Sequence, residues 1–271
     1  MTICKSEYQI ITDIKRKIVN LAIKNGVGHI PSCFSSLEIL YTLYSKIANI
    51  TIENKYDINR DKVIISKEHC KPALLYILEH FDLLSDDVIE KWSYNEGLVG
   101  HDIFKEVATT DLSAIDVSYG SLGQGIGIGI GLAIANPNNN IYVIVGDGEL
   151  QEGSCWEAIM FIGHNKIKNI TIIVDRNYIQ GGDYTKNIID SSSNVKEQIL
   201  SFQLDVIECD GHDIDSLEAA FNQKTERPKC IVANTIKGKE CLFIAEEKGF
   251  GYHHNHTYTK AEFNRILEEI K

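Results

Sequence analysis

This chain of 271 residues has few prolines and no closely paired cysteines. It also has no excess of basic residues and no long apolar run. Only 4 prolines occur, and none marks a break between domains. The 7 cysteines are scattered without a C-x-x-C pair, which argues for reduced thiols and against a disulfide framework or a zinc site. No apolar run reaches the roughly 20 residues of a membrane span. Charges begin at Lys5, so no secretory signal is expected, and we predict a cytoplasmic protein without membrane association.

The charge balance is acidic. The chain has 27 Lys and Arg against 38 Asp and Glu, which gives a net charge of −11 and an isoelectric point near 5.3. Nucleic acid and anionic membrane surfaces are polyanions, so neither is an expected partner. The hydrophobic fraction of 44% is ordinary for a globular protein. With no linker or repeat visible, we expect one domain over residues 1–271.

Short apolar runs typical of strands alternate with segments of helical periodicity, most clearly in the second half of the chain. The strand-like runs cover residues 63–65, 141–145, 170–174, 205–209 and 230–234. Helices are expected over residues 8–24, 36–48, 72–80, 86–92, 121–135, 151–163, 195–202, 214–222 and 260–270, and loops over 93–119 and 180–194. This alternation predicts right-handed βαβ units, and therefore an α/β fold with a parallel sheet flanked by helices.

Two neighbouring strand ends carry the most informative polar residues. The tripeptide GDG at 146–148 follows the run 141–145, and Asn177 follows the run 170–174. Because ligands bind at the carboxyl ends of strands in an open α/β sheet, we expect the Asp147 carboxylate and the Asn177 amide oxygen to lie side by side. Mg²⁺ favours such oxygen ligands and needs few of them when a phosphate supplies the rest. The pattern therefore predicts a clamp for a metal ion and a diphosphate.

Glycines are concentrated in the expected helix at 121–135. Each glycine inside a helix costs about 1 kcal/mol relative to alanine, so their number indicates close packing or proximity to a ligand. Gly123 and Gly125 fall at the expected helix start, where free N–H groups can face a cofactor. Close packing of two backbones is the alternative for Gly127, Gly129 and Gly131.

Three histidines lie in loops beside glycine or a strand end, in the segments NGVGHIP, SKEHCKP and GLVGHD. They are His29, His69 and His101. Loops carry sites on rigid scaffolds, and imidazoles transfer protons near neutral pH, so a shared cleft is expected. By contrast, we interpret three others as surface residues or as satisfied core residues, namely His80, His164 and His212.

Seven segments in one order resemble the transketolase family, specifically its N-terminal, diphosphate-binding half. They read GHIPSCFSSLEIL, VIISKEHCKPALLY, GLVGHD, GSLGQGIGIGIGLA, GDGELQEGSCWEA, VDRNYIQ and NTIKGK. The resemblance covers nearly the whole chain. It implies a thiamine-diphosphate-binding fold and an enzyme that transfers a two-carbon ketol unit from a ketose or its phosphate to an aldose or its phosphate. It also implies a partner subunit that carries the pyrimidine-binding domain, in an α₂β₂ assembly.

The resemblance implies roles position by position. Asp147, the Asn177 side chain and the Ile179 carbonyl would bind Mg²⁺ or Ca²⁺ together with the two phosphates of thiamine diphosphate. Contacts to the cofactor are implied for His69, Gly120, Leu122, Gly148, Glu152, Asn177 and His253. The implied catalytic residues are His29, His69, His101 and His253, with His254 as an alternative to the last. Glu152 would join a carboxylate network between paired sites, or else serve only as an acid at a helix N-terminus.

The sequence departs from the family pattern at Glu68, where glycine is frequent, and at Glu240, where a G-K-G motif ends in glutamate. Two alternatives stay open. One is the α-subunit of a 2-oxoacid dehydrogenase, which shares GDG and Asn but has less need of the loop histidines. The other is a noncatalytic subunit of the same fold, which the intact Asp147 and Asn177 argue against. Central pentose phosphate metabolism and a specialised sugar pathway are both compatible with the sequence.

Overall fold

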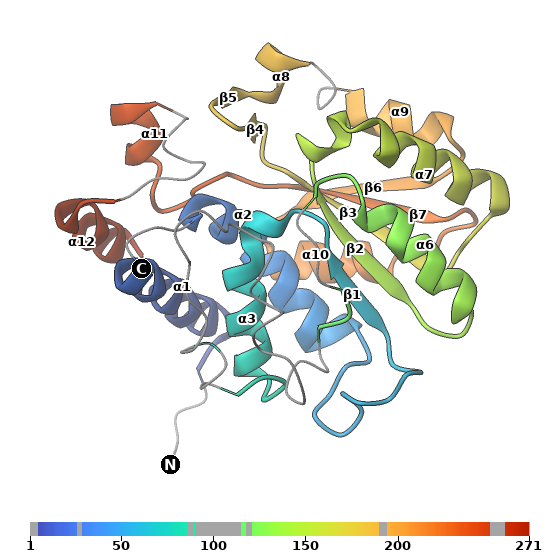
Figure 1. The fold of residues 1–271 in the computed structure, drawn as a ribbon, viewed down its shortest axis with the longest axis horizontal. Coiled ribbons are helices and arrows are strands. Elements are labelled where there is room, and N and C mark those ends of the chain that lie inside the picture. The colour runs from blue at the N-terminus through green and yellow to red at the C-terminus, as the bar shows by residue number, and fades with distance from the viewer. Residues whose placement is uncertain are drawn as a thin grey trace.

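Five strands form one parallel sheet, in the order β1-β2-β3-β7-β6 (Figure 1). They are β1 (Lys62–Ile65), β2 (Ile141–Gly146), β3 (Ile170–Arg176), β6 (Asp205–Asp210) and β7 (Lys229–Asn234). The computed structural model describes residues 5–25, 29–85, 89, 115–117, 121–189, 194–249 and 258–270. Every pair of neighbouring strands in this sheet is parallel, which confirms the α/β fold predicted from the sequence.

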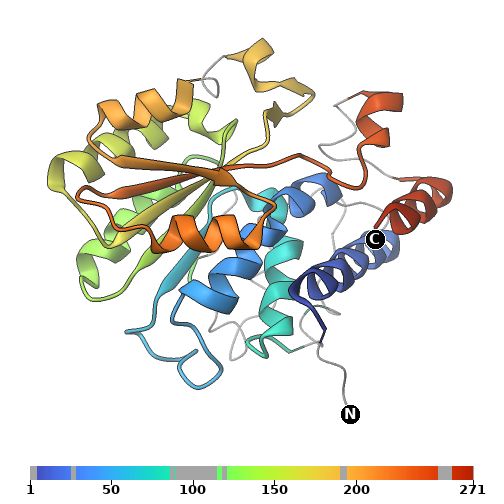
Figure 2. The same ribbon diagram turned by 180° about the vertical axis from the view of Figure 1, so that it is seen from behind.

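Helices cover both faces of the sheet (Figures 1 and 2). One side carries α1 (Glu7–Asn25), α2 (Ile30–Thr42), α3 (Lys71–His80) and α10 (Ile214–Asn222). The other side carries α6 (Gly125–Ala135), α7 (Gly153–Asn165) and α9 (Val195–Ser201). Near the end of the chain are α11 (Phe243–Lys248) and α12 (Lys260–Glu269), of which α12 packs against α1. None of the helices that the structure describes is long and apolar enough to cross a membrane.

Alternate side chains of the central strands enter two separate apolar cores. In β2, Tyr142 and Ile144 belong to the core formed with α2, α3 and α10, whereas Val143 and Val145 belong to the core formed with α6 and α7. All residues of β2 are buried, as expected for a strand that is covered on both faces. This explains why the strands read as continuous apolar runs in the sequence.

Helix α6 lies unusually close to the sheet at Gly129. A Cβ added to Gly129 would lie 2.7 Å from Val143 Cγ2, whereas Gly127 and Gly131 face open space. Close packing on the sheet therefore accounts for Gly129 alone among these three glycines. The helix begins at Gly125 rather than at the predicted residue 121, because the residues between form a turn.

The second helix also differs from its prediction over 36–48. It begins at Ile30, because Pro31 suits the first turn of a helix, where a missing N–H costs nothing. After Thr42 the backbone continues as a π-helical turn over Leu43–Ile47.

Residues 180–194, predicted as loop, contain regular structure where they are described. A hairpin forms between β4 (Ile179–Gln180) and β5 (Asp183–Tyr184), followed by the short α8 (Thr185–Ile188). Helix α11 was not predicted either, because its six residues are too few to show a clear period. The predicted helix 86–92 and loop 93–119 lie outside the described residues, except for residues 89 and 115–117.

The carboxyl ends of the central strands meet along one edge of the sheet. Their register places Gly146 of β2 opposite Asp175 of β3, and Arg176 opposite Asn234 of β7. The segments that leave these strands therefore start side by side, although they are far apart in the sequence.

Candidate functional site

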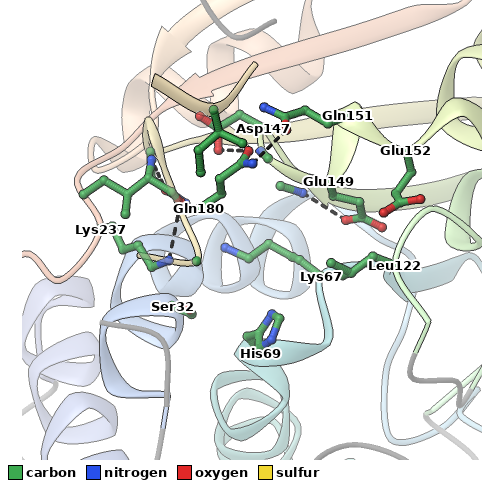
Figure 3. Close-up of a pocket in the computed structure, with 16 residues that line it drawn as sticks. Ser32, Lys67, His69, Leu122, Asp147, Glu149, Gln151, Glu152, Gln180 and Lys237 are labelled. Carbon is green, nitrogen blue, oxygen red and sulfur yellow. Dashed lines mark hydrogen bonds between the residues drawn. The ribbon is translucent and has the colours of Figure 1, made fainter. Parts of the chain in front are cut away.

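A cavity of about 300 Å³ opens at the carboxyl edge of the sheet (Figure 3). Its walls come from the segments after β1, β2, β3 and β7 and from the start of α2. Among the residues that line it are all the described ones that the sequence predicted to bind cofactor or metal, namely His69, Leu122, Asp147, Gly148, Glu152, Asn177 and Ile179. The predicted residues Gly120, His101, His253 and His254 lie outside the described part of the chain.

Asp147 and Asn177, which directly follow the neighbouring strands β2 and β3, both line the cavity at this edge. The fully buried Asp147 accepts hydrogen bonds from the N–H groups of Gly148, at 2.9 Å, and Tyr178, at 2.7 Å. Asn177 Oδ1 accepts from the Ile179 N–H at 3.1 Å. Between them, Tyr178 has a φ of +63°, a left-handed conformation that is unfavourable for a bulky side chain. This strained turn folds Ile179 back into the wall of the cavity, beside the carboxylate.

The oxygen-rich wall fits a hard cation. Burial, together with the neighbouring charge of Asp175, raises the pKa of Asp147 to about 6. A bound divalent cation would favour the charged form of such a carboxylate. The donor set of a carboxylate, an amide and a backbone carbonyl consists of the oxygen ligands that Mg²⁺ and Ca²⁺ take.

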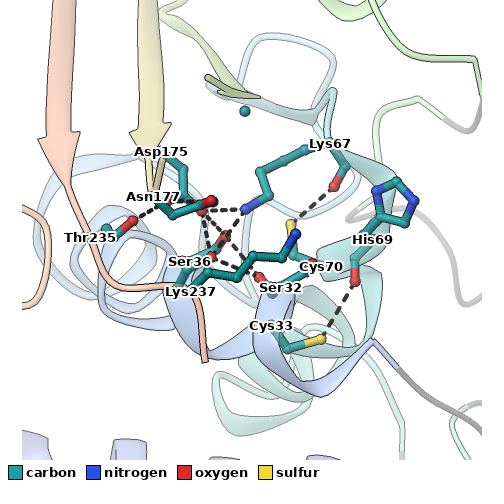
Figure 4. Close-up of polar contacts among 12 residues, drawn as sticks. Ser32, Cys33, Ser36, Lys67, His69, Cys70, Asp175, Asn177, Thr235 and Lys237 are labelled. Atoms are coloured by element: carbon teal, nitrogen blue, oxygen red, sulfur yellow. Dashed lines mark hydrogen bonds and ion pairs between the residues drawn. The ribbon is translucent and has the colours of Figure 1, made fainter. Parts of the chain in front are cut away.

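Asp175 is a central residue that the sequence reasoning missed (Figure 4). Its fully buried carboxylate accepts hydrogen bonds from the hydroxyls of Ser35 and Ser36, both at 2.8 Å. It also contacts the Lys67 ammonium and the Thr235 hydroxyl. Burial would raise the pKa of Asp175, but the Lys67 charge and these hydrogen bonds lower it to about 2. One carboxylate thus joins α2, β3 and the segments after β1 and β7.

Two buried lysines reach into the cavity, Lys67 from the end of β1 and Lys237 from beyond β7 (Figure 3). The Lys237 ammonium donates to the Ile179 carbonyl at 3.4 Å. Burial, with repulsion from Lys67, lowers the pKa of Lys237 to about 8. A buried cation in an open cavity suits an anionic ligand, because the anion would offset its desolvation. The strand-end rule that found Asp147 would have found both lysines, since each also follows a strand.

Glycines shape two parts of the wall. A Cβ added to Gly148 would lie 2.5 Å from Gln180 Cβ, so only glycine fits beside the β4–β5 hairpin. Gly123, with a φ of +81°, turns the chain before α6 and places Leu122 in the cavity. The buried Glu149 holds this turn, because its carboxylate accepts from the N–H groups of Gly123, at 2.9 Å, and Gly146, at 3.1 Å.

The predicted histidines are partly brought together. His69 lines the cavity, and the buried His29 packs edge-on against it with 4.7 Å between ring centroids. His29 also begins α2, since its carbonyl accepts from the Ser32 and Cys33 N–H groups at 3.1 Å. Glu152 lies exposed at the cavity rim, just before α7.

Comparisons with known proteins agree with this geometry. The model of the family "Transketolase, thiamine diphosphate binding domain" matches residues 6–255. The chain is 32% identical over 268 residues to an apulose-4-phosphate transketolase subunit from Actinobacillus succinogenes, covering 95% of this chain and 93% of that one. It is also 32% identical over 259 residues to the 6-deoxy-6-sulfo-D-fructose transketolase subunit SqwG of a Clostridium species, with coverages of 92% and 90%.

Solved structures show the same fold. The transketolase from Leishmania mexicana superposes with a TM-score of 0.79 at 22% sequence identity. The match covers 98% of this chain but 41% of that one, so the chain spans less than half the length of this relative. From the family match, the subunit-length relatives and the shared fold together, we conclude that this chain belongs to the transketolase family and corresponds to its thiamine diphosphate binding domain.

Proposed function

We propose that this chain is the diphosphate-binding subunit of a split transketolase, which moves a two-carbon ketol unit from a ketose to an aldose. The observation that carries the proposal is the meeting of Asp147, Asn177 and the Ile179 carbonyl in one cavity with two lysine ammonium groups. Oxygen ligands for a divalent cation and positive charges for phosphates occur together where a metal-bound diphosphate is held. The relatives named as transketolase subunits match nearly the whole chain, which supports a role as one subunit of a larger enzyme.

The described residues divide into two groups around the cofactor. Asp147, Asn177 and the Ile179 carbonyl would hold Mg²⁺ or Ca²⁺, and Lys237 would face the phosphates. Gly148 allows the turn after β2 to pack against the hairpin at this wall, because a Cβ there would lie 2.5 Å from Gln180 Cβ. When bound, thiamine diphosphate supplies the carbon centre that carries the ketol unit.

The histidines would serve the reacting end of the site. His69 lies in the cavity wall, and His29 supports it from behind through the edge-on ring contact. Imidazoles in this position can exchange protons with carbonyl and hydroxyl oxygens of a sugar. His101 and His253, or His254, are proposed for the same task on the strength of the family resemblance.

We further propose that a second chain holds the aminopyrimidine end of the cofactor, in an α₂β₂ assembly. The names of the subunit-length relatives support a partner of this kind. Relatives also act, by their names, on a sugar phosphate and a sulfosugar, so an anionic ketose is the proposed donor. We expect the partner to provide most contacts to the anionic group of the sugar, because the net charge of −11 on this chain repels anions.

Calorimetry with thiamine diphosphate and Mg²⁺ tests the site, using this chain alone and mixed with the candidate partner. We expect Asp147→Ala to raise the dissociation constant about tenfold or more, which is about 1.4 kcal/mol. Asp215→Ala is the matched control, because Asp215 is exposed in the first turn of α10, away from the cavity. Equal affinities for wild type and Asp147→Ala would refute the metal clamp.

Activity assays of this chain mixed with its candidate partner distinguish the transketolase hypothesis from the 2-oxoacid dehydrogenase hypothesis. Ketol transfer from a ketose phosphate that needs both chains supports the split transketolase. Turnover of a 2-oxoacid with an artificial electron acceptor, without ketol transfer, would instead favour the dehydrogenase reading. Full ketol transfer by this chain alone would show that no partner is required.

A further inference from the structure

A set of ionisable side chains lies behind the cavity, outside the residues that line it. Lys15 of α1 is 4% exposed, Glu38 of α2 is 2% exposed, and His212, after β6, is 9% exposed. The Lys15 ammonium lies 3.2 Å from Glu38 Oε1 and 2.7 Å from Glu240 Oε2, and His212 Nδ1 lies 3.1 Å from Glu38 Oε2. We call Lys15, Glu38, His212 and the partly exposed Glu240 the buried charge network.

His212 connects this network to the backbone beside Lys237. Its Nε2 accepts a hydrogen bond from the Ile236 N–H at 2.9 Å. Because a backbone N–H can only donate, Nε2 carries no proton, and the proton of the neutral ring lies on Nδ1 and is donated to Glu38. The ring is therefore fixed in one tautomer, and it fixes the residue that immediately precedes Lys237.

Glu240 holds the other end of the same segment. Its φ is +66°, in the left-handed region where a side chain is costly. The ion pair with the buried Lys15 offsets that cost, because loss of the Glu240 carboxylate would leave the Lys15 ammonium with Glu38 as its remaining ion-pair partner. Gly238, with a φ of +74°, donates its N–H to the Pro31 carbonyl at 3.1 Å.

Segment 235–240 is thus anchored on both sides of Lys237. Thr235 is bound to Asp175, Ile236 to His212 and Glu240 to Lys15. A buried ammonium loses hydration, so Lys237 would turn toward solvent if the backbone that carries it were free to move. The anchors prevent this motion.

We propose that the buried charge network positions segment 235–240, so that the Lys237 ammonium stays in the cavity beside the Ile179 carbonyl. His212 and Glu240 are positioning residues: neither lines the cavity, and both act through Lys237. The consequence for ligand binding rests on the proposed function, in which Lys237 faces the diphosphate. The anchoring itself does not depend on that function.

Hydrogen–deuterium exchange of the full chain tests the anchoring directly. We expect His212→Phe to speed exchange of the Ile236 amide about tenfold, because its acceptor is lost. Glu240→Gln and Lys15→Met should speed exchange across 236–240. His212→Gln, which keeps an acceptor, should recover part of the protection.

Matched controls come from the same elements or the same residue types. Lys17→Met removes an exposed lysine from α1, and His164→Phe removes an exposed histidine from α7. Neither should change exchange at 236–240. If Lys15→Met does not fold, Glu240→Gly still tests the network, because it removes the carboxylate and also relieves the left-handed strain. Like Glu240→Gln, it should speed exchange across 236–240, and unchanged exchange would count against the network.

Binding of Mg²⁺-pyrophosphate, measured by calorimetry, tests the link to Lys237. Lys237→Met and His212→Phe should each raise the dissociation constant about fivefold or more. The double variant should bind no worse than Lys237→Met, because both changes act through the same ammonium. Independent, additive losses would overturn the proposal.

The remaining outcomes distinguish the positioning of segment 235–240 from the proposed binding of a metal-bound diphosphate. Unchanged exchange at Ile236 in His212→Phe and Glu240→Gln overturns the positioning role, whatever the binding data show. If Lys237→Met weakens pyrophosphate binding but His212→Phe does not, although exchange at Ile236 is faster, the positioning role is also overturned, because the segment then does not control Lys237. If the wild-type chain and Asp147→Ala bind Mg²⁺-pyrophosphate equally weakly, the proposed function fails, and the exchange data alone decide the anchoring.

Discussion

Replacement of Lys67 by methionine tests how far the site depends on its buried ion pair with Asp175. Asp175 is fully buried and Lys67 is 5% exposed, so Lys67→Met leaves an interior carboxylate without its cation. Removing one partner of a buried pair costs about 3–5 kcal/mol. The carboxylate keeps hydrogen bonds from Ser35, Ser36 and Thr235, which places the expected loss near the lower end. We expect the free energy of unfolding to fall by about 3 kcal/mol.

Urea denaturation followed by circular dichroism measures this loss. With a slope of about 3 kcal/mol per molar urea, the midpoint should fall by about 1 M. Lys17→Met is the control, because the Lys17 side chain is 46% exposed in its pair with Glu79, and exposed pairs contribute about 0–1 kcal/mol.

A double variant sharpens the test. Lys67→Met with Asp175→Asn removes both charges and keeps a side-chain oxygen as hydrogen-bond acceptor, so it should be more stable than Lys67→Met alone. A loss below about 1 kcal/mol in Lys67→Met, or a double variant less stable than the single one, would refute the reasoning.

Three further predictions concern the cavity wall, the packing of α7 and the buried charge network. Gly148→Ala should weaken thiamine diphosphate binding about tenfold in calorimetry, because the added methyl would lie 2.5 Å from Gln180 Cβ and would displace the hairpin that forms this wall of the cavity. Unchanged affinity would show that this wall does not contribute to binding. Gly163→Ala should lower the unfolding midpoint strongly, since its Cβ would lie 1.8 Å from the Phe202 carbonyl oxygen, and a wild-type midpoint would count against this helix position. Burial opposes the charge of Glu38, but His212 and Lys15 outweigh it and lower the pKa below 4.5. The charged Glu38 carboxylate therefore contributes fully to stability above about pH 4.5, and this contribution is lost as the pH falls through the lower pKa of the folded state. Glu38→Gln should remove this part of the acid-induced decrease in the free energy of unfolding, measured from pH 6 to 3.

The sequence by itself determined the fold class and led to the prediction of the oxygen clamp. Both follow from local pattern: apolar runs define the strands, helical periods define the crossovers, and parallel strands bring their carboxyl ends to one edge. Asp147 and Asn177 could be placed together because each directly follows a strand, and those strands are neighbours. Element boundaries were less certain, as α2 and the β4–β5 hairpin show, because proline in a first turn and two-residue strands leave no period to detect.

Only the tertiary structure decided which of the groups around this predicted clamp pair with one another. Lys67 and Asp175 are 108 positions apart, and Lys15 and Glu240 are 225 apart, so no spacing rule connects them. A charged side chain on the surface can be hydrated by water, whereas a buried one needs a partner within the protein. Which charges are buried, and which partner each one contacts, depends on the fold. His212 is a further example. The sequence indicated only a surface residue or a core residue with satisfied hydrogen bonds, whereas the structure shows that its ring contacts Glu38 and accepts from the Ile236 N–H, next to Lys237.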